Sequence, residues 1–216
     1  MANIINQQKA LKPGITDFAI LVIWVTIIFL TWLFMHGAHH FLTLTPAALG
    51  KYFTLKWVVI SHITAGGGSL ILGFVQFWPR LRSYSWKLHR MIGLLYLLAV
   101  LLSSICAVIL AFTTAKQVNW AYAFSLQVWV TVWISATALA YYFALKKQFK
   151  LHQEWMVRSY LVTLAFIISG LALKTPFIAS LGSFADISPS LFWMGWAVPL
   201  YVYQIVLSSK FKAVRR

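Results

Sequence analysis

Acidic residues are nearly absent from this sequence. Its 216 residues include only three, Asp17, Glu154 and Asp186, against eighteen lysines and arginines. Three carboxylates so widely spaced cannot assemble a catalytic dyad or a chain of proton-relay groups inside a bilayer. This shortage argues against a proton-coupled transporter.

Cysteine and polar surface are scarce as well. The single cysteine, Cys106, cannot form an intrachain disulfide, and we expect it to pack inside a helix. Only 10% of the residues are charged and 61% are hydrophobic, which leaves too little polar surface to cover a water-soluble globule. No serine lies in a nucleophile motif, and no glycine-rich phosphate loop is present. The composition therefore predicts an integral membrane protein.

The net charge of +15 suggests a nucleic-acid partner at first sight. The basic residues, however, occur in short groups between apolar runs, without a continuous basic face or a binding motif. We therefore expect no nucleic-acid partner and the lipid bilayer as the main surroundings.

Six apolar segments are long enough, or nearly so, to cross a hydrocarbon core of about 30 Å at about 1.5 Å per residue. They are Phe18–Met35, Trp57–Trp78, Met91–Phe112, Trp120–Leu145, Trp155–Leu173 and Leu191–Ser208, the last with Pro199 as an expected kink. We predict an all-α membrane protein, a six-transmembrane-helix bundle that forms one membrane domain over residues 1–216. A cleaved signal peptide ending near Pro46 is the alternative for the first segment, but the run is longer than a usual signal core.

The basic residues between the segments predict the orientation. With the N-terminus inside, four of them fall outside and fourteen inside, and cytoplasmic loops are the ones enriched in lysine and arginine. We therefore predict cytoplasmic N and C termini in a bacterial inner membrane. The outer four are Lys51, Lys56, Lys116 and Lys174; the inner ones are Lys9, Lys12, Arg80, Arg82, Lys87, Arg90, Lys146, Lys147, Lys150, Arg158, Lys210, Lys212, Arg215 and Arg216.

Polar and small residues within the segments predict which helix faces look inward. Small residues allow close approach of helices, and polar ones avoid lipid. We therefore expect the second, third and fourth segments to share an interior, which the fifth joins through His152. The stripes that recur at helical spacing are His62, Gly66, Ser69, Gly73 and Gln76; His89, Gly93 and Tyr96; and Gln127, Thr131 and Ser135.

The six histidines fall into two layers under this topology. The layers are expected to lie roughly 20 Å apart along the membrane normal. His62 and His89 therefore cannot share one site, although only a short basic turn separates their helices. The outer layer contains His36, His39, His40 and His62, and the inner layer contains His89 and His152.

His89 and His152 are the first candidate pair of haem ligands. A neutral imidazole is a good axial ligand for haem iron, and helix bundles build such sites from side chains on facing helices. The two histidines share one depth, and Gly93 leaves room for a flat ring one turn from His89. The alternative is that both are solvated or hydrogen-bonded to loop carbonyls. Basic residues near this layer could pair with haem propionates: Arg82, Lys87, Arg90, Lys150 and, on the fifth segment, Arg158.

His62 lies about 8 Å inside the outer boundary, where an imidazole needs a partner. One hypothesis is a second haem, with Gly66 providing space beside the ring. The alternative is a structural hydrogen bond to Gln127, to a helix carbonyl or to water.

His36, His39 and His40 have i, i+3, i+4 spacing, which can place three rings on one helix face. Such a cluster could bind zinc, copper or nickel, or could supply a second ligand opposite His62. An ordinary interfacial cluster is the competing interpretation.

Three stretches of the sequence resemble one known pattern. They are His62 with the glycines after it and Gly73-Phe-Val-Gln76-Phe; His89-Arg90-Met-Ile-Gly93-Leu-Leu-Tyr96; and His152-Gln-Glu-Trp155-Met156-Val-Arg158-Ser159-Tyr160. Over residues 55–175 the chain looks like the predicted bacterial membrane proteins grouped as domain-of-unknown-function family 2306. The resemblance implies a multi-pass inner-membrane protein in which His62, His89 and His152 are marked positions. It implies no activity.

The chain has a looser likeness to transmembrane di-haem cytochromes b, including ferric reductases and quinol-linked cytochromes. In those proteins a four-helix core carries two stacked haems, with ligands paired between alternate helices. His89 and His152 match one such pair. The other pair would need a histidine on the fourth segment, which has none, unless the first segment supplies His36, His39 or His40.

The equal-depth histidines therefore favour a b-type haem-binding electron-transfer protein, with one haem b at the inner layer and a second at the outer layer. Its partner would be a quinol or a redox protein, and as an enzyme it would be a membrane oxidoreductase. The alternatives are a haem-free assembly subunit of a membrane complex and metal handling at the outer histidine cluster.

Overall fold

Six long helices confirm the predicted all-α membrane bundle. The computed structural model describes residues 15–214, so Lys9, Lys12, Arg215 and Arg216, which contributed to the predicted topology, lie outside the described residues. Within the described range all regular elements are helical, and six helices are long and apolar enough to cross a membrane. They are α1 (Ile15–Ala38), α3 (Lys56–Gln76), α5 (Trp86–Leu110), α6 (Trp120–Leu145), α7 (Phe149–Ala172) and α9 (Phe184–Val214).

Short helical segments join the long helices. The predicted basic turn after Pro79 contains a helix of its own, and α9 continues through Pro199, the expected kink. Proline starts three of the short helices, where its missing N–H removes no hydrogen bond. The short segments are η1 (His39–Thr43), α2 (Pro46–Leu49), η2 (Gly50–Leu55), α4 (Pro79–Tyr84), the π-helical η3 (Ala111–Ala115) and α8 (Pro176–Ala179).

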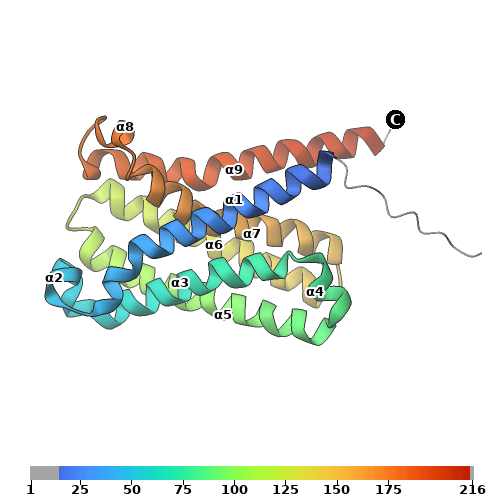
Figure 1. Ribbon diagram of the computed structural model, residues 1–216, viewed down its shortest axis with the longest axis horizontal. Helices are drawn as coiled ribbons and strands as arrows, with labels where there is room; N and C mark the ends of the chain where they lie inside the picture. Colours follow the sequence, from blue (N-terminus) through green and yellow to red (C-terminus); the bar gives the residue numbers. More distant parts are fainter. Residues whose placement is uncertain (1–14, 215–216) are drawn as a thin grey trace, which may run out of the picture.

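Four helices enclose the core of the bundle. α3 packs along α5, α5 contacts α6, α6 packs along α7, and α7 closes the ring against α3. This arrangement confirms that the second to fifth predicted segments share an interior. α1 and α9 lie outside the ring: α9 packs on α6 and α7, and α1 crosses α3 and α7, with the Trp24 ring 5.1 Å from that of Phe74 (Figure 1).

The start of α1 and the end of α9 lie at the same end of the bundle, which also carries α4 (Figure 1). A bundle that crosses the membrane an even number of times begins and ends on the same side. The basic residues around α4 therefore lie on the same side as the start of α1 and the end of α9. That this side faces the cytoplasm remains a prediction from charge.

The inward face of α6 differs from the predicted one. Thr131 and Ser135 are exposed, whereas Trp129 and Trp133 are buried in the core. Thr131 can face lipid because its hydroxyl donates to the Gln127 carbonyl, one turn earlier, at 2.9 Å. The predicted stripe was therefore wrong for this helix, since a threonine bonded to its own backbone no longer has to avoid lipid.

A hydrogen-bonded group of five side chains, here the central polar cluster, fills the middle of the core. The Tyr96 hydroxyl lies 2.7 Å from Ser159 Oγ and 3.0 Å from Thr163 Oγ1. Trp133 Nε1 donates to Thr163 Oγ1 at 2.8 Å, and Thr137 Oγ1 lies 2.7 Å from Ser159 Oγ. All five are buried, and polar groups away from water are stable only when they bond one another. The cluster therefore ties α5, α6 and α7 together.

Candidate cofactor site

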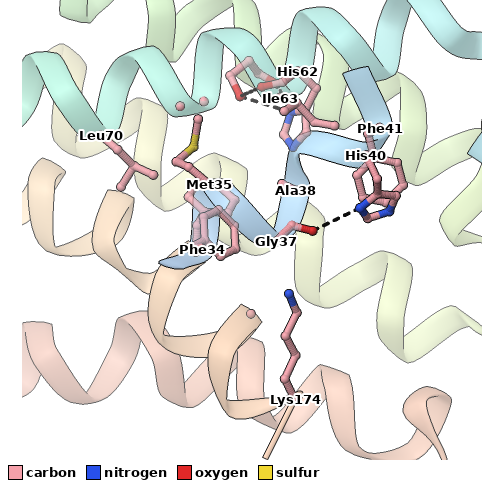
Figure 2. A pocket seen from close by; sticks show the side chains of 15 residues that line it. Phe34, Met35, Gly37, Ala38, His40, Phe41, His62, Ile63, Leu70 and Lys174 are labelled. Atoms are coloured by element: carbon pink, nitrogen blue, oxygen red, sulfur yellow. Dashed lines mark hydrogen bonds between the residues drawn. The ribbon is translucent and has the colours of Figure 1, made fainter. Parts of the chain in front are cut away.

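A cavity of about 390 Å³, here the His62 cavity, lies at one end of the bundle between α1 and the core. Its size falls within the range of about 300–1,000 Å³ that is typical of small-molecule sites, and its walls are mostly apolar. Figure 2 shows the side chains that converge on it from α1, η1, α3 and the end of α7. The lining residues are Phe34, Met35, Gly37, Ala38, His40, Phe41, His62, Ile63, Gly66, Gly67, Leu70, Ser103, Phe166, Gly170 and Lys174.

The His62 imidazole projects from α3 into this cavity (Figure 2). Its Nδ1 lies 3.0 Å from the Ser103 carbonyl oxygen of α5 and 3.1 Å from Ser103 Oγ. Because a carbonyl oxygen only accepts, Nδ1 carries the hydrogen and Nε2 keeps a free lone pair. Metal-bound histidines have this same arrangement, with the second ring nitrogen bonded to a carbonyl or carboxylate. Of the partners expected for His62, the structure provides a helix carbonyl.

One of the three clustered histidines at the junction of α1 and η1 lines the cavity. His40 lines it, whereas His36 and His39 do not. The helix gives way to η1 at His39, and Nδ1 of His39 and of His40 turn back to the carbonyl oxygens of His36 and Gly37, at 2.6 and 3.1 Å. Among residues 15–214, no three His, Cys, Asp or Glu side chains are arranged to hold a metal ion. The predicted three-histidine metal site is not formed, because the helical spacing behind it stops at Ala38.

Glycines let α1 approach the core closely beside the cavity. A Cβ on Gly67 of α3 would lie 2.6 Å from Met35 Cε, and a Cβ on Gly170 of α7 would lie 2.6 Å from Phe34 Cε2. A side chain at Gly170 would have to displace the Phe34 ring, and one at Gly67 would have to displace the end of the Met35 side chain. Gly66, the glycine predicted to stand beside His62, lines the cavity and leaves room for the Ser103 hydroxyl.

One lysine reaches the cavity from the end of α7. The Lys174 side chain extends toward Gly37 of α1, where a Cβ would lie 2.5 Å from Nζ (Figure 2). In the part of the chain that the structure describes, no carboxylate pairs with this ammonium. Asp186 instead accepts a hydrogen bond from Ser183, and Glu154 follows the inner His152 by two residues, near the other end of the bundle.

The inner histidines lie near one another at the opposite end. His89, in the first turn of α5, is within electrostatic range of His152 and Arg82. His152 Nδ1 lies 2.8 Å from the Ala140 carbonyl oxygen of α6, which again leaves Nε2 free. His89 Nδ1 is buried and has no hydrogen-bond partner among the described residues. The two rings therefore have unused nitrogen atoms at a shared depth.

Gln76 occupies the glycine face that was expected to hold an inner porphyrin. Its Nε2 donates to the His89 carbonyl at 2.7 Å and would lie 3.4 Å from a Cβ on Gly93. A flat ligand at this position would have to displace the Gln76 side chain.

The basic residues that were predicted to surround the inner histidines do not all lie near them. Arg82 lies near His89, and Arg90 is exposed. Arg158 turns toward α9, where it donates to Gln204 Oε1 at 3.0 Å and packs over the Tyr203 ring. Arg158 therefore fastens α7 to α9 and points away from the inner histidines.

Two successive seven-residue intervals along α5 separate the two histidine layers. On α5, Tyr96 stands seven residues after His89 and seven before Ser103, which bonds the outer histidine. On α7, Ser159 stands seven residues after His152. Seven residues of α-helix span about 10 Å, so the central polar cluster lies midway between layers that are roughly 20 Å apart.

Sequence reasoning missed three contributors to the outer site: Ser103, Phe166 and Lys174. Ser103 had a usable signal, since a serine in an apolar span seeks a partner on a neighbouring helix. Lys174 was predicted only as an outer charge, because its direction depends on where α1 crosses α7. Phe166, whose ring centroid lies 6.4 Å from that of His62, stands in an apolar run that does not distinguish it.

Comparison with known proteins identifies one family. A family model described as "Predicted membrane protein (DUF2306)" matches residues 59–207. The match begins inside α3, so it includes His62, His89 and His152 but excludes α1 and His40. No curated protein and no solved structure matches the chain significantly, so the likeness to di-haem cytochromes b gains no support from these comparisons.

Proposed function

This chain belongs to the DUF2306 family of predicted membrane proteins, whose description names no activity, and we propose that it binds haem b in the His62 cavity and transfers single electrons within the membrane. The observation that carries the proposal is the His62 ring, which is fixed by Ser103 and presents a free Nε2 to an apolar cavity of about 390 Å³.

A second potential ligand lines the same cavity. His40 Nδ1 lies 3.1 Å from the Gly37 carbonyl oxygen, so its Nε2 is also free. His62 comes from α3 and His40 from η1, and these two residues would hold the haem iron. Phe34 and Phe166 would pack on the porphyrin and exclude water from it.

Bound haem b would supply a one-electron Fe(III)/Fe(II) couple, and the protein would set its depth and potential through ligands, hydrogen bonds and burial. The sealed core supports electron transfer over solute transport. Tyr96 and Trp133 are fully buried in the central polar cluster, so side chains fill the space between the two ends of the bundle. A quinol or a redox protein at the membrane surface is the proposed partner, and a bacterial inner membrane the proposed location.

The inner layer is a second candidate haem position. The observation in its favour is the buried, unpartnered Nδ1 of His89 opposite His152, whose own Nδ1 is bonded to Ala140. Gln76 would have to leave Gly93 for a porphyrin to enter. A porphyrin would therefore need a larger rearrangement of side chains at the inner site than in the His62 cavity.

An absorption spectrum of the protein purified from haem-sufficient cells tests the proposal. We expect a Soret band and, after reduction with dithionite, an α-band. His62→Ala should abolish or strongly reduce both, whereas His36→Ala, at a histidine that does not line the cavity, should leave them unchanged. His40→Ala should convert a six-coordinate spectrum to a five-coordinate one.

Three other outcomes are informative. Bands that survive in His62→Ala but vanish in His152→Ala would move the cofactor to the inner layer. A colourless, folded wild type would overturn the proposal. A colourless wild type that co-purifies with a membrane complex would favour the assembly-subunit alternative.

A further inference from the structure

Lys174 gives the His62 cavity a chemical preference that its apolar walls do not have. The lysine lies just beyond α7, and its side chain runs inward beneath α1 to Gly37 (Figure 2). The absence of a side chain at Gly37 makes room for this position of the ammonium, because a Cβ there would lie 2.5 Å from Nζ and the lysine would have to move. The ammonium therefore stands at the edge of the cavity that holds His40 and His62.

Among the side chains that the structure describes, none neutralises this positive charge. No carboxylate pairs with Lys174 within residues 15–214, and the nearby titratable side chains on the cavity are the two histidines. Asp17 lies near the start of α1 and precedes Gly37 by 20 residues, which corresponds to about 30 Å along the helix. An ammonium beside an apolar space attracts an anion because the low dielectric strengthens their interaction.

We propose that the His62 cavity takes an apolar, membrane-dissolved molecule that carries a carboxylate, and that Lys174 holds this carboxylate. The inference rests on the proposed function for one identity of the occupant, haem b: Lys174 would hold one of its two propionates, and the other would lie outside the reach of this ammonium. It extends to any amphipathic carboxylic acid that reaches the cavity from the bilayer.

A carboxylate fits this position better than a phosphate. One ammonium balances one negative charge, and the adjacent end of α1 presents carbonyl oxygens, such as that of Gly37, which repel further negative charge. The apolar body of the molecule would lie against Leu70, Phe34 and Phe166.

A binding titration with matched ligands tests the inference. Detergent-solubilised protein without bound haem is titrated with haem b and with its dimethyl ester, which has no carboxylate. Lys174→Gln should weaken haem b binding about tenfold, in line with the loss of one charge-assisted hydrogen bond, and should change ester binding less than about twofold. Lys174→Arg should restore most of the affinity, and Lys116→Gln, at an outer lysine away from the cavity, should have no effect.

The outcomes separate this inference from the proposed function. If the wild type binds no haem, the haem proposal fails, and thermal stabilisation by oleate compared with methyl oleate then measures the carboxylate preference directly. A preference for oleate that disappears in Lys174→Gln would support the inference without haem. Equal binding of acid and ester by the wild type, or an unchanged affinity in Lys174→Gln, would overturn it.

Discussion

Tyr96 shows how one hydroxyl joins three helices inside a bilayer. It lies on α5, and its two partners Ser159 and Thr163 lie on α7, where each is also bonded to a side chain of α6. The members of the cluster provide hydrogen-bond partners for one another, so the core can contain five polar side chains without water. The same residues would be destabilising if one partner were absent.

Tyr96→Phe should lower the free energy of unfolding by about 1 kcal/mol. The substitution keeps the ring and removes two hydrogen bonds, and single interhelical hydrogen bonds in membrane proteins contribute about 0.6 kcal/mol on average. Unfolding by SDS in mixed micelles measures the change. Tyr141→Phe, at an exposed position on α6, is the control and should have almost no effect; equal effects of the two substitutions would contradict a stabilising role for the cluster.

At single residues the sequence predicted the histidines better than their surroundings. His62, His89 and His152 stand out because a polar ring in an apolar helix must have a partner. The choice of His40 over His36 and His39 could not be predicted, because it depends on where α1 unwinds. The direction of Lys174 was likewise unpredictable, since it depends on the crossing of α1 and α7.

At the scale of helices, α1 is the unusual element. It lies outside the core ring and outside the family match, yet it closes the His62 cavity and its end leads into His40. The glycines Gly67 and Gly170 receive its side chains. The family core therefore contributes His62, held by Ser103, and α1 contributes a wall of the cavity and leads into His40.

Packing between α3 and its neighbours depends on Gly73. A Cβ at this position would clash with the Tyr160 ring and lie 3.1 Å from Tyr96 Cε2. Gly73→Ala should therefore destabilise the protein by about 1–3 kcal/mol through overpacking, measured by the same SDS unfolding.

Gly68→Ala is the matched control on the same helix. No atom lies within 4 Å of a Cβ at Gly68, so this substitution should be neutral or slightly stabilising, because alanine favours the helix over glycine. A Gly73→Ala variant as stable as Gly68→Ala would show that α3 and Tyr160 can separate without loss.

Helix positions were predictable from hydropathy, and helix faces only in part. The stripes on α3 and α5 matched the buried faces because histidine, glutamine and tyrosine cannot satisfy themselves on their own helix. The stripe predicted on α6 did not match the buried face, because the Thr131 hydroxyl bonds a carbonyl of its own helix and can therefore face lipid. The buried face of α6 carries tryptophans, which occur both in cores and at lipid interfaces and so give no direction.

For the whole molecule, charge distribution predicts a single orientation. A C-terminal fusion to green fluorescent protein should be fluorescent in a bacterial host, and a C-terminal fusion to alkaline phosphatase should be inactive, because the basic loops predict that both termini face the cytoplasm. A phosphatase inserted at Gly182, between α8 and α9, is the control and should be active. The reverse pattern of fluorescence and phosphatase activity would show that the bundle has the opposite orientation, with the His62 cavity near the cytoplasm.

The central polar cluster also determines how the molecule responds to the membrane potential. Because buried side chains fill the middle of the bundle, we expect most of the voltage drop to fall between the two histidine layers. A charge that moved across this distance, roughly 20 Å of a hydrocarbon core of about 30 Å, would change in energy by about 1.5 kcal/mol per 100 mV. Electron exchange between the layers would therefore be driven or opposed by the energised membrane, whereas exchange confined to the His62 cavity would be almost independent of it.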